Sequence, residues 1–251
     1  MTLRYGDLES LKSKKMASSF AAAMLDKGTG RLTRQEIEDE IDRLKARLRI
    51  FGGANNTSVI LETERENLPE LVKLVGEMLK SPAFPEEEFE KIKQEAGIEQ
   101  NRSQPMSIAS QEFSRRLRPY SKEDVRYNMT FDEEIAAIKA LTLEEVMAFY
   151  KEFYGASAAT LAIIGDFEEA DIKAIVEEQF GDWENPVEFQ RLETPDFPKQ
   201  PANEMINTPD KANAMFLAGH LIDMRDDHPD YPALVLGNYM LGGGFLNSRL
   251  A

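Results

Sequence analysis

The chain passes from one predicted helix into the next within residues 24–36, which read Met-Leu-Asp-Lys-Gly-Thr-Gly-Arg-Leu-Thr-Arg-Gln-Glu. Gly28 ends the first helix, because glycine is a usual residue just past a helix terminus. Thr33 and Glu36 have the spacing of a capping box, which opens the second helix. Apolar residues at helical spacing extend the two helices over about 8–25 and 33–48.

Strand-like segments lie on both sides of this helix pair. Residues 2–5 alternate in polarity before it, and residues 49–53 and 57–63 follow it as two strands joined by a turn. Apolar runs at 161–166 and 214–219 predict two more strands. Further helices are expected over about 67–81, 85–103, 108–117, 130–140, 142–154, 170–180 and 232–241. Consecutive strands with helices between them favour an α+β fold, a mainly antiparallel sheet with helices packed on it.

A proline-rich stretch divides the chain. Four prolines fall within residues 186–201, which is a strong linker signal. We therefore expect a complete α+β unit over 1–195. Residues 196–251 are expected to form a linker and the truncated start of a second, related unit, because a strand followed by a glycine-terminated helix recurs there. Both ends of the chain are expected to be truncations of a longer polypeptide.

Composition excludes several classes of function. Forty-five acidic and 30 basic residues give a net charge of −15, which argues against a general nucleic-acid or anionic-membrane surface. The chain has no cysteine, so disulfides, thiol nucleophiles and cysteine-bound zinc are excluded. The acid-rich stretches 36–42 and 86–99 are interpreted as solvated helix faces, although an acidic lining could also attract basic peptides.

No apolar run approaches the roughly 18–20 residues that a membrane-spanning helix needs, so no membrane insertion is expected. The chain is interpreted as soluble. Both the bacterial periplasm and the cytoplasm remain open, because the absence of cysteine suits either compartment.

Short segments along nearly the whole chain carry a resemblance to a known family. They lie at residues 24–29, 67–69, 82–88, 141–144, 149–150, 164–167, 180–183, 231–234, 241–245 and 248–250. Together, and in this order, they resemble the pitrilysin/insulinase-type (inverzincin) zinc metallopeptidases, the family that includes mitochondrial processing peptidase.

The resemblance implies where a zinc motif would lie. Active members carry His-x-x-Glu-His on the helix immediately before the first of these segments. Two histidines four residues apart share a helix face and can hold zinc, while the glutamate acts as general base on the zinc-bound water. Counted back from Met24, the two histidine positions hold Ser19 and Ala23, and the base position holds Ala22. The resemblance thus implies no catalytic residue and no bound cofactor in this chain.

The family's remaining zinc ligand is a glutamate further along the chain. Its spacing from Ala23 suggests Glu99, with Glu95 one helical turn earlier as the alternative. A single carboxylate cannot hold a catalytic zinc ion without partners. Glu99 is therefore interpreted as a vestigial ligand candidate or as an ordinary polar helix residue.

Other candidate sites have simpler interpretations. His220 and His228 lie among aspartates, but a polar loop is favoured over a metal site. The glycines at 242–244 are interpreted as a helix terminator rather than a phosphate loop, because no Gly-Lys-Ser/Thr follows. Ser19 has no histidine near it in sequence, which favours a packing role over that of a nucleophile.

These features predict an inactive, peptidase-like domain of a larger zinc metalloprotease. The resemblance implies a clamshell of two halves, in which the zinc belongs to an active partner half on the same or a separate polypeptide. The degenerate half then helps to enclose a peptide substrate. A non-enzymatic structural or assembly subunit of the same fold is the alternative. A third hypothesis is an enzyme with an unrecognised metal site at Glu95 and Glu99.

Overall fold

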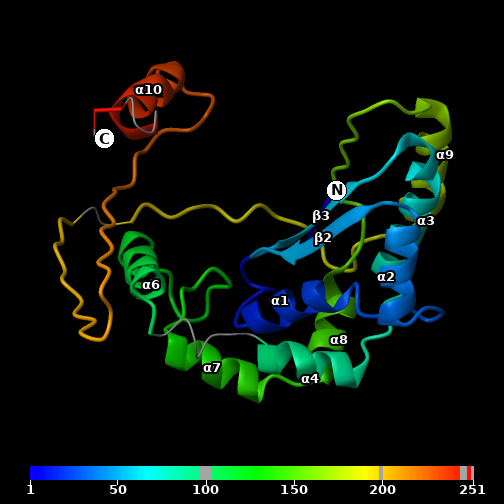
Figure 1. Cartoon of the computed structure of the whole chain (residues 1–251), viewed down its shortest axis with the longest axis horizontal. Coiled ribbons are helices and arrows are strands. Elements are labelled where there is room, and N and C mark those ends of the chain that lie inside the picture. The colour runs from blue at the N-terminus through cyan, green and yellow to red at the C-terminus, as the bar shows by residue number, and fades with distance from the viewer. Residues whose placement is uncertain (96–102, 198–199, 244–247, 250–251) are drawn as a thin grey trace.

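A small antiparallel sheet has helices packed around it (Figure 1). The computed structural model describes residues 1–95, 103–197, 200–243 and 248–249. Three strands, β1 (Thr2–Arg4), β2 (Arg47–Gly52) and β3 (Asn56–Glu62), lie in the order β1-β3-β2. This arrangement confirms the α+β class.

The register of the sheet follows from a hairpin. β2 and β3 pair antiparallel from Arg47 opposite Glu62 to Gly52 opposite Thr57. The N-terminal strand β1 joins the other side of β3, with Thr2 opposite Ser58. β2 therefore lies at an edge of the sheet, with no second strand neighbour within the part of the chain that the structure describes.

The helices match the capping signals of the sequence. Thr33 and Glu36 form the expected capping box, and Thr130 and Thr142 cap later helices in the same way. The helices are α1 (Lys15–Met24), α2 (Arg34–Arg43), α3 (Leu68–Lys80), α4 (Glu86–Glu95), α6 (Pro105–Leu117), α7 (Phe131–Ala140), α8 (Leu143–Phe153), α9 (Glu169–Phe180) and α10 (Tyr231–Asn238). A 3₁₀ turn, Arg65–Asn67, precedes α3, and a π-helical turn, Tyr239–Gly243, follows α10.

Two predicted strands are wrong. Residues 161–166 and 214–219 form no regular strand. Thr160 exchanges backbone hydrogen bonds of 2.8 and 3.0 Å with Thr2, but the ladder does not continue, and Ile164 is 98% exposed. An apolar run becomes a strand only where a neighbour pairs with it, and none of the described residues pairs with these two runs.

The predicted bounds of the first helices also needed correction. α1 begins at Lys15 and not at residue 8, because residues 8–13 form turns. Leu48 belongs to β2 and not to the second helix. The chain leaves α2 at Leu44, and the next residue, Lys45, has a left-handed φ of 48° that redirects it into the strand.

The core is centred on Tyr5, which directly follows β1. Its ring lies 5.6 Å from Phe149 and 5.3 Å from Tyr154, measured between centroids. Its hydroxyl forms 3.2 Å hydrogen bonds with Ser18 Oγ and Thr57 Oγ1, and Thr57 Oγ1 lies 2.7 Å from Tyr154 Oη. This buried chain of hydroxyl groups joins β1, α1, β3 and the end of α8.

The C-terminal part of the chain extends away from this core (Figure 1). Phe197 is buried against Tyr120, with ring centroids 5.0 Å apart, and Arg116 forms an ion pair with Glu204. Beyond these contacts residues 200–243 are mostly exposed, including α10. Among the described residues, no helix is both long enough and apolar enough to cross a membrane.

Candidate functional site

The positions of the predicted motif border a groove between α1 and α4. The groove has a volume of about 460 Å³. Ser19 and Ala23 come from α1, Ile50 from β2, and Lys91 and Glu95 from α4. We call it the α1–α4 groove; Phe20, Asp26, Lys27, Arg34 and Ile92 complete its lining.

The structure brings two of the three motif positions together on this surface. Ser19 and Ala23 lie one helical turn apart and both line the groove. Ala22 does not line it and is fully buried. Its Cβ lies 3.1 Å from the place that a Cβ atom on Gly52 would occupy, so the helix packs directly on β2 at this point.

The donor chemistry of the groove does not fit a zinc ion. The methyl group of Ala23 has no lone pair, and a neutral serine hydroxyl such as that of Ser19 is not among the usual zinc ligands. Glu95 lines the groove, whereas Glu99 lies outside the described residues. Within the described ranges, no three His, Asp or Glu side chains lie close enough together to hold a metal ion.

Ion pairs engage several charged side chains of the groove. Arg34 contacts Glu38 at 2.9 Å and Glu88 at 2.8 Å, and these hydrogen bonds, the one to Glu88 first, raise the pKa of Arg34. Lys91 contacts Glu88 at 2.9 Å and is the largest cause of the lowered pKa of that carboxyl. Lys27 pairs with Asp26 at 2.8 Å. In each of these ion pairs the opposite charges largely cancel, so the paired residues add little net charge to the α1–α4 groove.

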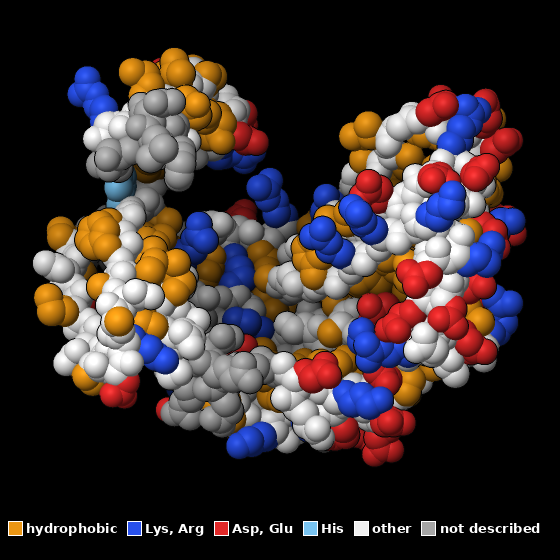
Figure 2. Space-filling view, in the orientation of Figure 1, with side chains coloured by type: hydrophobic (Ala, Val, Ile, Leu, Met, Phe, Trp, Pro, Cys, Tyr) orange, Lys and Arg blue, Asp and Glu red, His pale blue; other side chains and the backbone are white. Residues whose placement is uncertain are grey.

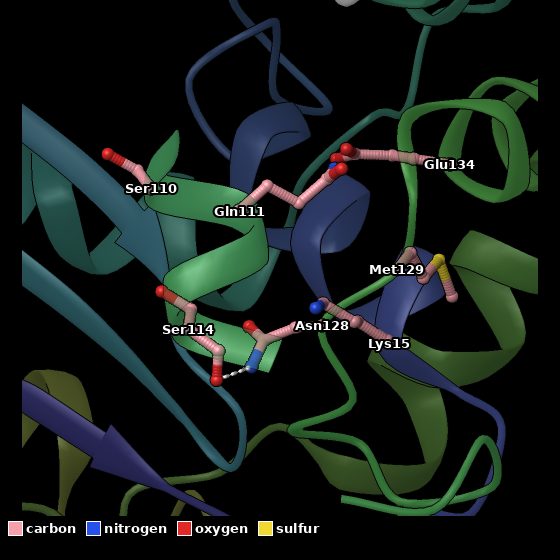
Figure 3. A pocket seen from close by; sticks show the side chains of 7 residues that line it. All are labelled: Lys15, Ser110, Gln111, Ser114, Asn128, Met129 and Glu134. Carbon is pink, nitrogen blue, oxygen red and sulfur yellow. Dashed lines mark hydrogen bonds between the residues drawn. The ribbon is translucent and has the colours of Figure 1, made fainter. Parts of the chain in front are cut away.

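A second, polar cavity of about 270 Å³ lies near the start of α1 (Figure 3). Lys15 contributes from α1, and its Nζ donates a hydrogen bond to the carbonyl oxygen of Tyr127. Burial lowers the pKa of Lys15, and the negative charge of Glu134 partly opposes this effect. Asn128 Nδ2 donates to the carbonyl oxygen of Ser114 at 3.4 Å. Ser110, Gln111 and Met129 complete the lining, which contains no histidine that could activate a serine.

Both histidines lie far along the chain from these cavities, in exposed loop structure. His220 Nδ1 lies 3.2 Å from the carbonyl oxygen of Leu221, and the backbone N–H of Asp230 donates to His228 Nδ1 at 3.1 Å. These are local loop contacts, as the sequence favoured. Gly242 and Gly243 belong to the π-helical turn after α10, and Gly244 lies outside the described residues.

The sequence did not point to the free edge of β2 as part of the site. Ile50 of this strand lines the groove, while Arg47, Arg49 and Phe51 are exposed. The alternation of Arg, Leu, Arg and Ile at residues 47–50 was a strand signal. Its position at the sheet edge depends on β1 joining the far side of β3, which no local pattern encodes.

Comparisons with protein families divide the chain between two family models. The model described as "Insulinase (Peptidase family M16)" matches residues 9–117 and includes α1. The model described as "Peptidase M16 inactive domain" matches residues 140–251. A search of curated proteins found no match.

Solved structures share the fold. The peptidase M16 inactive domain from Pseudomonas fluorescens is 22% identical with a TM-score of 0.76, over 99% of this chain and 60% of that one. A protease from Helicobacter pylori is 20% identical with a TM-score of 0.59, over 80% and 48% of the two chains. The periplasmic protease PqqL from Escherichia coli is 13% identical with a TM-score of 0.59, over 77% and 22%. The chain thus spans 60% or less of the length of each of these proteins.

Proposed function

The chain belongs to the M16 (insulinase, or pitrilysin-type) peptidase family, and we propose that it serves as a non-catalytic domain that helps to enclose peptides cleaved by an active, zinc-bearing partner half. Its similarity to the inactive domain of the family covers residues 140–251. The partner half, its zinc and its peptide substrate are parts of this proposal.

The observation that carries the proposal is the composition of the α1–α4 groove. We interpret Ser19, Ala22 and Ala23 as the vacated positions of the zinc motif. Ser19 and Ala23 line a groove that is open to solvent, so there is space beside α1, but neither of the two assigned histidine positions carries a zinc ligand. A groove of about 460 Å³, in which the described residues form no cluster of three metal ligands, suits binding rather than hydrolysis.

The adjoining strand supports a role in peptide binding. Ile50 of β2 reaches the groove, and the edge of β2 has no strand partner among the described residues. An extended peptide can pair with a free strand edge through backbone hydrogen bonds, while pockets beside the edge take alternate side chains. The groove and the edge together would present such a surface.

A reconstitution assay tests the proposal. Peptide cleavage by the active half, which we expect to carry His-x-x-Glu-His, is measured with and without this chain. We expect the chain to form a complex with it and to increase turnover. Turnover that is unchanged, with no complex formed, would overturn the proposal. A complex without any change in turnover would instead favour the structural or assembly role.

A groove-filling variant sharpens this assay. Ala23→Phe places a ring in the α1–α4 groove, and Ala136→Phe adds the same ring at an exposed position of α7. We expect Ala23→Phe to reduce the increase in turnover and Ala136→Phe to leave it unchanged. Equal effects of the two variants would argue against a role of the groove.

Metal analysis tests the absence of catalysis in this chain. Inductively coupled plasma mass spectrometry of the purified protein is expected to show less than stoichiometric zinc. One tightly bound zinc ion per chain would contradict the vacated motif. A Glu95→Gln variant that then lost the ion would support the hypothesis of an enzyme using Glu95.

A further inference from the structure

The outward face of β2 carries side chains that are exposed and do not pack into the core. Arg47, Arg49 and Phe51 point outward at alternate positions, while Leu48 and Ile50 are partly buried on the other side. Ile60 lies opposite Arg49 on the neighbouring strand β3. Phe51 is 51% exposed and Ile60 is 55% exposed. We call these four residues, Arg47, Arg49, Phe51 and Ile60, the β2 patch.

The two arginines of the β2 patch lack the close ion pairs with carboxylates that other arginines of the chain, such as Arg34, form. Arg49 forms no ion pair or side-chain hydrogen bond with any described residue. Arg47 lies 3.8 Å from Glu62, and the two side chains are 84% and 76% exposed, so solvent screens this contact strongly. Arg34, in contrast, contacts two glutamates at 2.8 and 2.9 Å.

The patch is therefore locally basic on a protein whose net charge is −15. Figure 2 shows Lys and Arg side chains beside hydrophobic ones over the region of β2 and β3. Asp and Glu side chains are more numerous along the right-hand side, where α2 and α3 lie, and are interspersed there with Lys and Arg. The net negative charge of the whole chain therefore does not predict the local positive charge of the β2 patch.

We propose that the β2 patch binds an extended peptide segment in which acidic side chains alternate with apolar ones. Side chains two residues apart on a strand lie on the same face and about 6.5–7 Å from one another. A peptide that pairs with the free edge of β2 has the same repeat, so its acidic side chains can reach Arg47 and Arg49. Its apolar side chains point to the opposite face, toward Ile50 and the α1–α4 groove. The inference rests on the proposed function and adds the substrate class.

Peptide binding to the full chain tests this assignment. Three fluorescein-labelled peptides with one apolar, β-branched framework carry Glu, Gln or Lys at alternate positions, and binding is followed by anisotropy. We expect the Glu peptide to bind more tightly than the Gln peptide and the Lys peptide most weakly. The preference for Glu should shrink between about 50 mM and 500 mM salt, because salt screens exposed charges.

A charge-matched pair of variants locates the contact. Arg47→Gln with Arg49→Gln is expected to weaken binding of the Glu peptide by roughly threefold to tenfold, and binding of the Gln peptide much less. Lys139→Gln with Lys173→Gln removes two charges from exposed positions of α7 and α9 and should leave both affinities unchanged. Circular dichroism checks that both variants are folded.

Equal affinities for the Glu and Gln peptides would overturn the acidic preference while leaving the proposed enclosure of peptides intact. The assignment to the β2 patch also fails if the Lys139/Lys173 variant loses as much affinity as the Arg47/Arg49 variant. If none of the three peptides binds, the inference is overturned, and the turnover assay with the active half decides separately on the proposed function.

Discussion

The Cβ of Ala22 on α1 lies 3.1 Å from the place that a Cβ atom on Gly52 of β2 would occupy. Helix and strand can approach this closely because the two residues have almost no side chain. Ala22 is fully buried as a result. The position that we assign to the general base of the motif is therefore closed by packing, whereas Ser19 and Ala23 line the α1–α4 groove.

Introducing a carboxylate at this position should destabilise the protein. Ala22→Glu buries a charge without a partner, and we expect the free energy of unfolding to fall by about 3–5 kcal/mol. The matched control is Ser19→Glu, whose side chain is exposed on the same helix and should change stability by less than about 1 kcal/mol. Urea titration followed by circular dichroism measures both. Similar values for the two variants would contradict the burial of Ala22.

The buried chain of hydroxyl groups around Tyr5 should contribute measurably to stability. Thr57→Val keeps the shape of the side chain but removes the hydrogen bonds to Tyr5 and Tyr154, and we expect a loss of about 1–3 kcal/mol. Thr2→Val is the control, because no side-chain hydrogen bond of Thr2 occurs among the described residues. Thermal unfolding that shifts equally for both variants would rule out a special role of this network.

Glu133 should make stability depend on pH under acidic conditions. Hydrogen bonds from Lys122 first, then from the backbone of Thr130 and from Tyr127, lower the pKa of Glu133 from 4.5 to about 2. Because the folded pKa is lower than the unfolded one, the ionised form stabilises the fold above about pH 4.5, and this contribution is lost as the pH falls toward 2.

Glu133→Gln retains a residue that can complete the capping box at Thr130, so it mainly removes the charge. We expect the variant to be less stable than the wild type at pH 7 and the difference to vanish near pH 2. Glu144→Gln, at an exposed position of α8, is the control and should show no such trend. A difference for Glu133→Gln that stays constant between pH 7 and pH 2 would contradict the lowered pKa.

We propose that residues 1–195 are a folding unit, which a truncation can test. Residues 200–243 are mostly exposed, so a chain ending at residue 195 loses few buried contacts, of which Phe197 against Tyr120 is one. Its melting temperature should lie within about 4 °C of that of the full chain. Limited trypsin digestion should likewise cut at Lys211 and Arg225 before it cuts the helices. A truncated chain that does not fold would overturn the proposed boundary.

Local signals in the sequence predicted most of the helices. Capping at Thr33, Thr130 and Thr142 involves residues three positions apart, so its physical cause lies within one helical turn. The strand predicted at 161–166 failed because hydrophobic composition alone does not supply a pairing partner. The bridge between Thr2 and Thr160 joins residues that are distant in sequence, and it does not extend into a ladder.

The candidate site was predictable in its chemistry but not in its geometry. The identity of Ser19, Ala22 and Ala23 was clear from the sequence, but their different surroundings were not. Glu95 lines the groove because α4 packs beside α1, a contact between distant segments that no local pattern encodes and that only the family resemblance had suggested. The unpaired edge of β2 could not be predicted from the sequence either, because it depends on the order of the strands in the sheet.

The sequence by itself determined which atoms are available: the alanines at positions 22 and 23 offer no metal ligand and no general base in any fold. Tertiary structure decided where those positions lie. It buried Ala22 against Gly52, left Ser19 and Ala23 on a groove, and exposed Arg49 at a sheet edge. The physical reason is that burial and strand pairing join residues far apart in the chain, whereas chemical identity belongs to each residue alone.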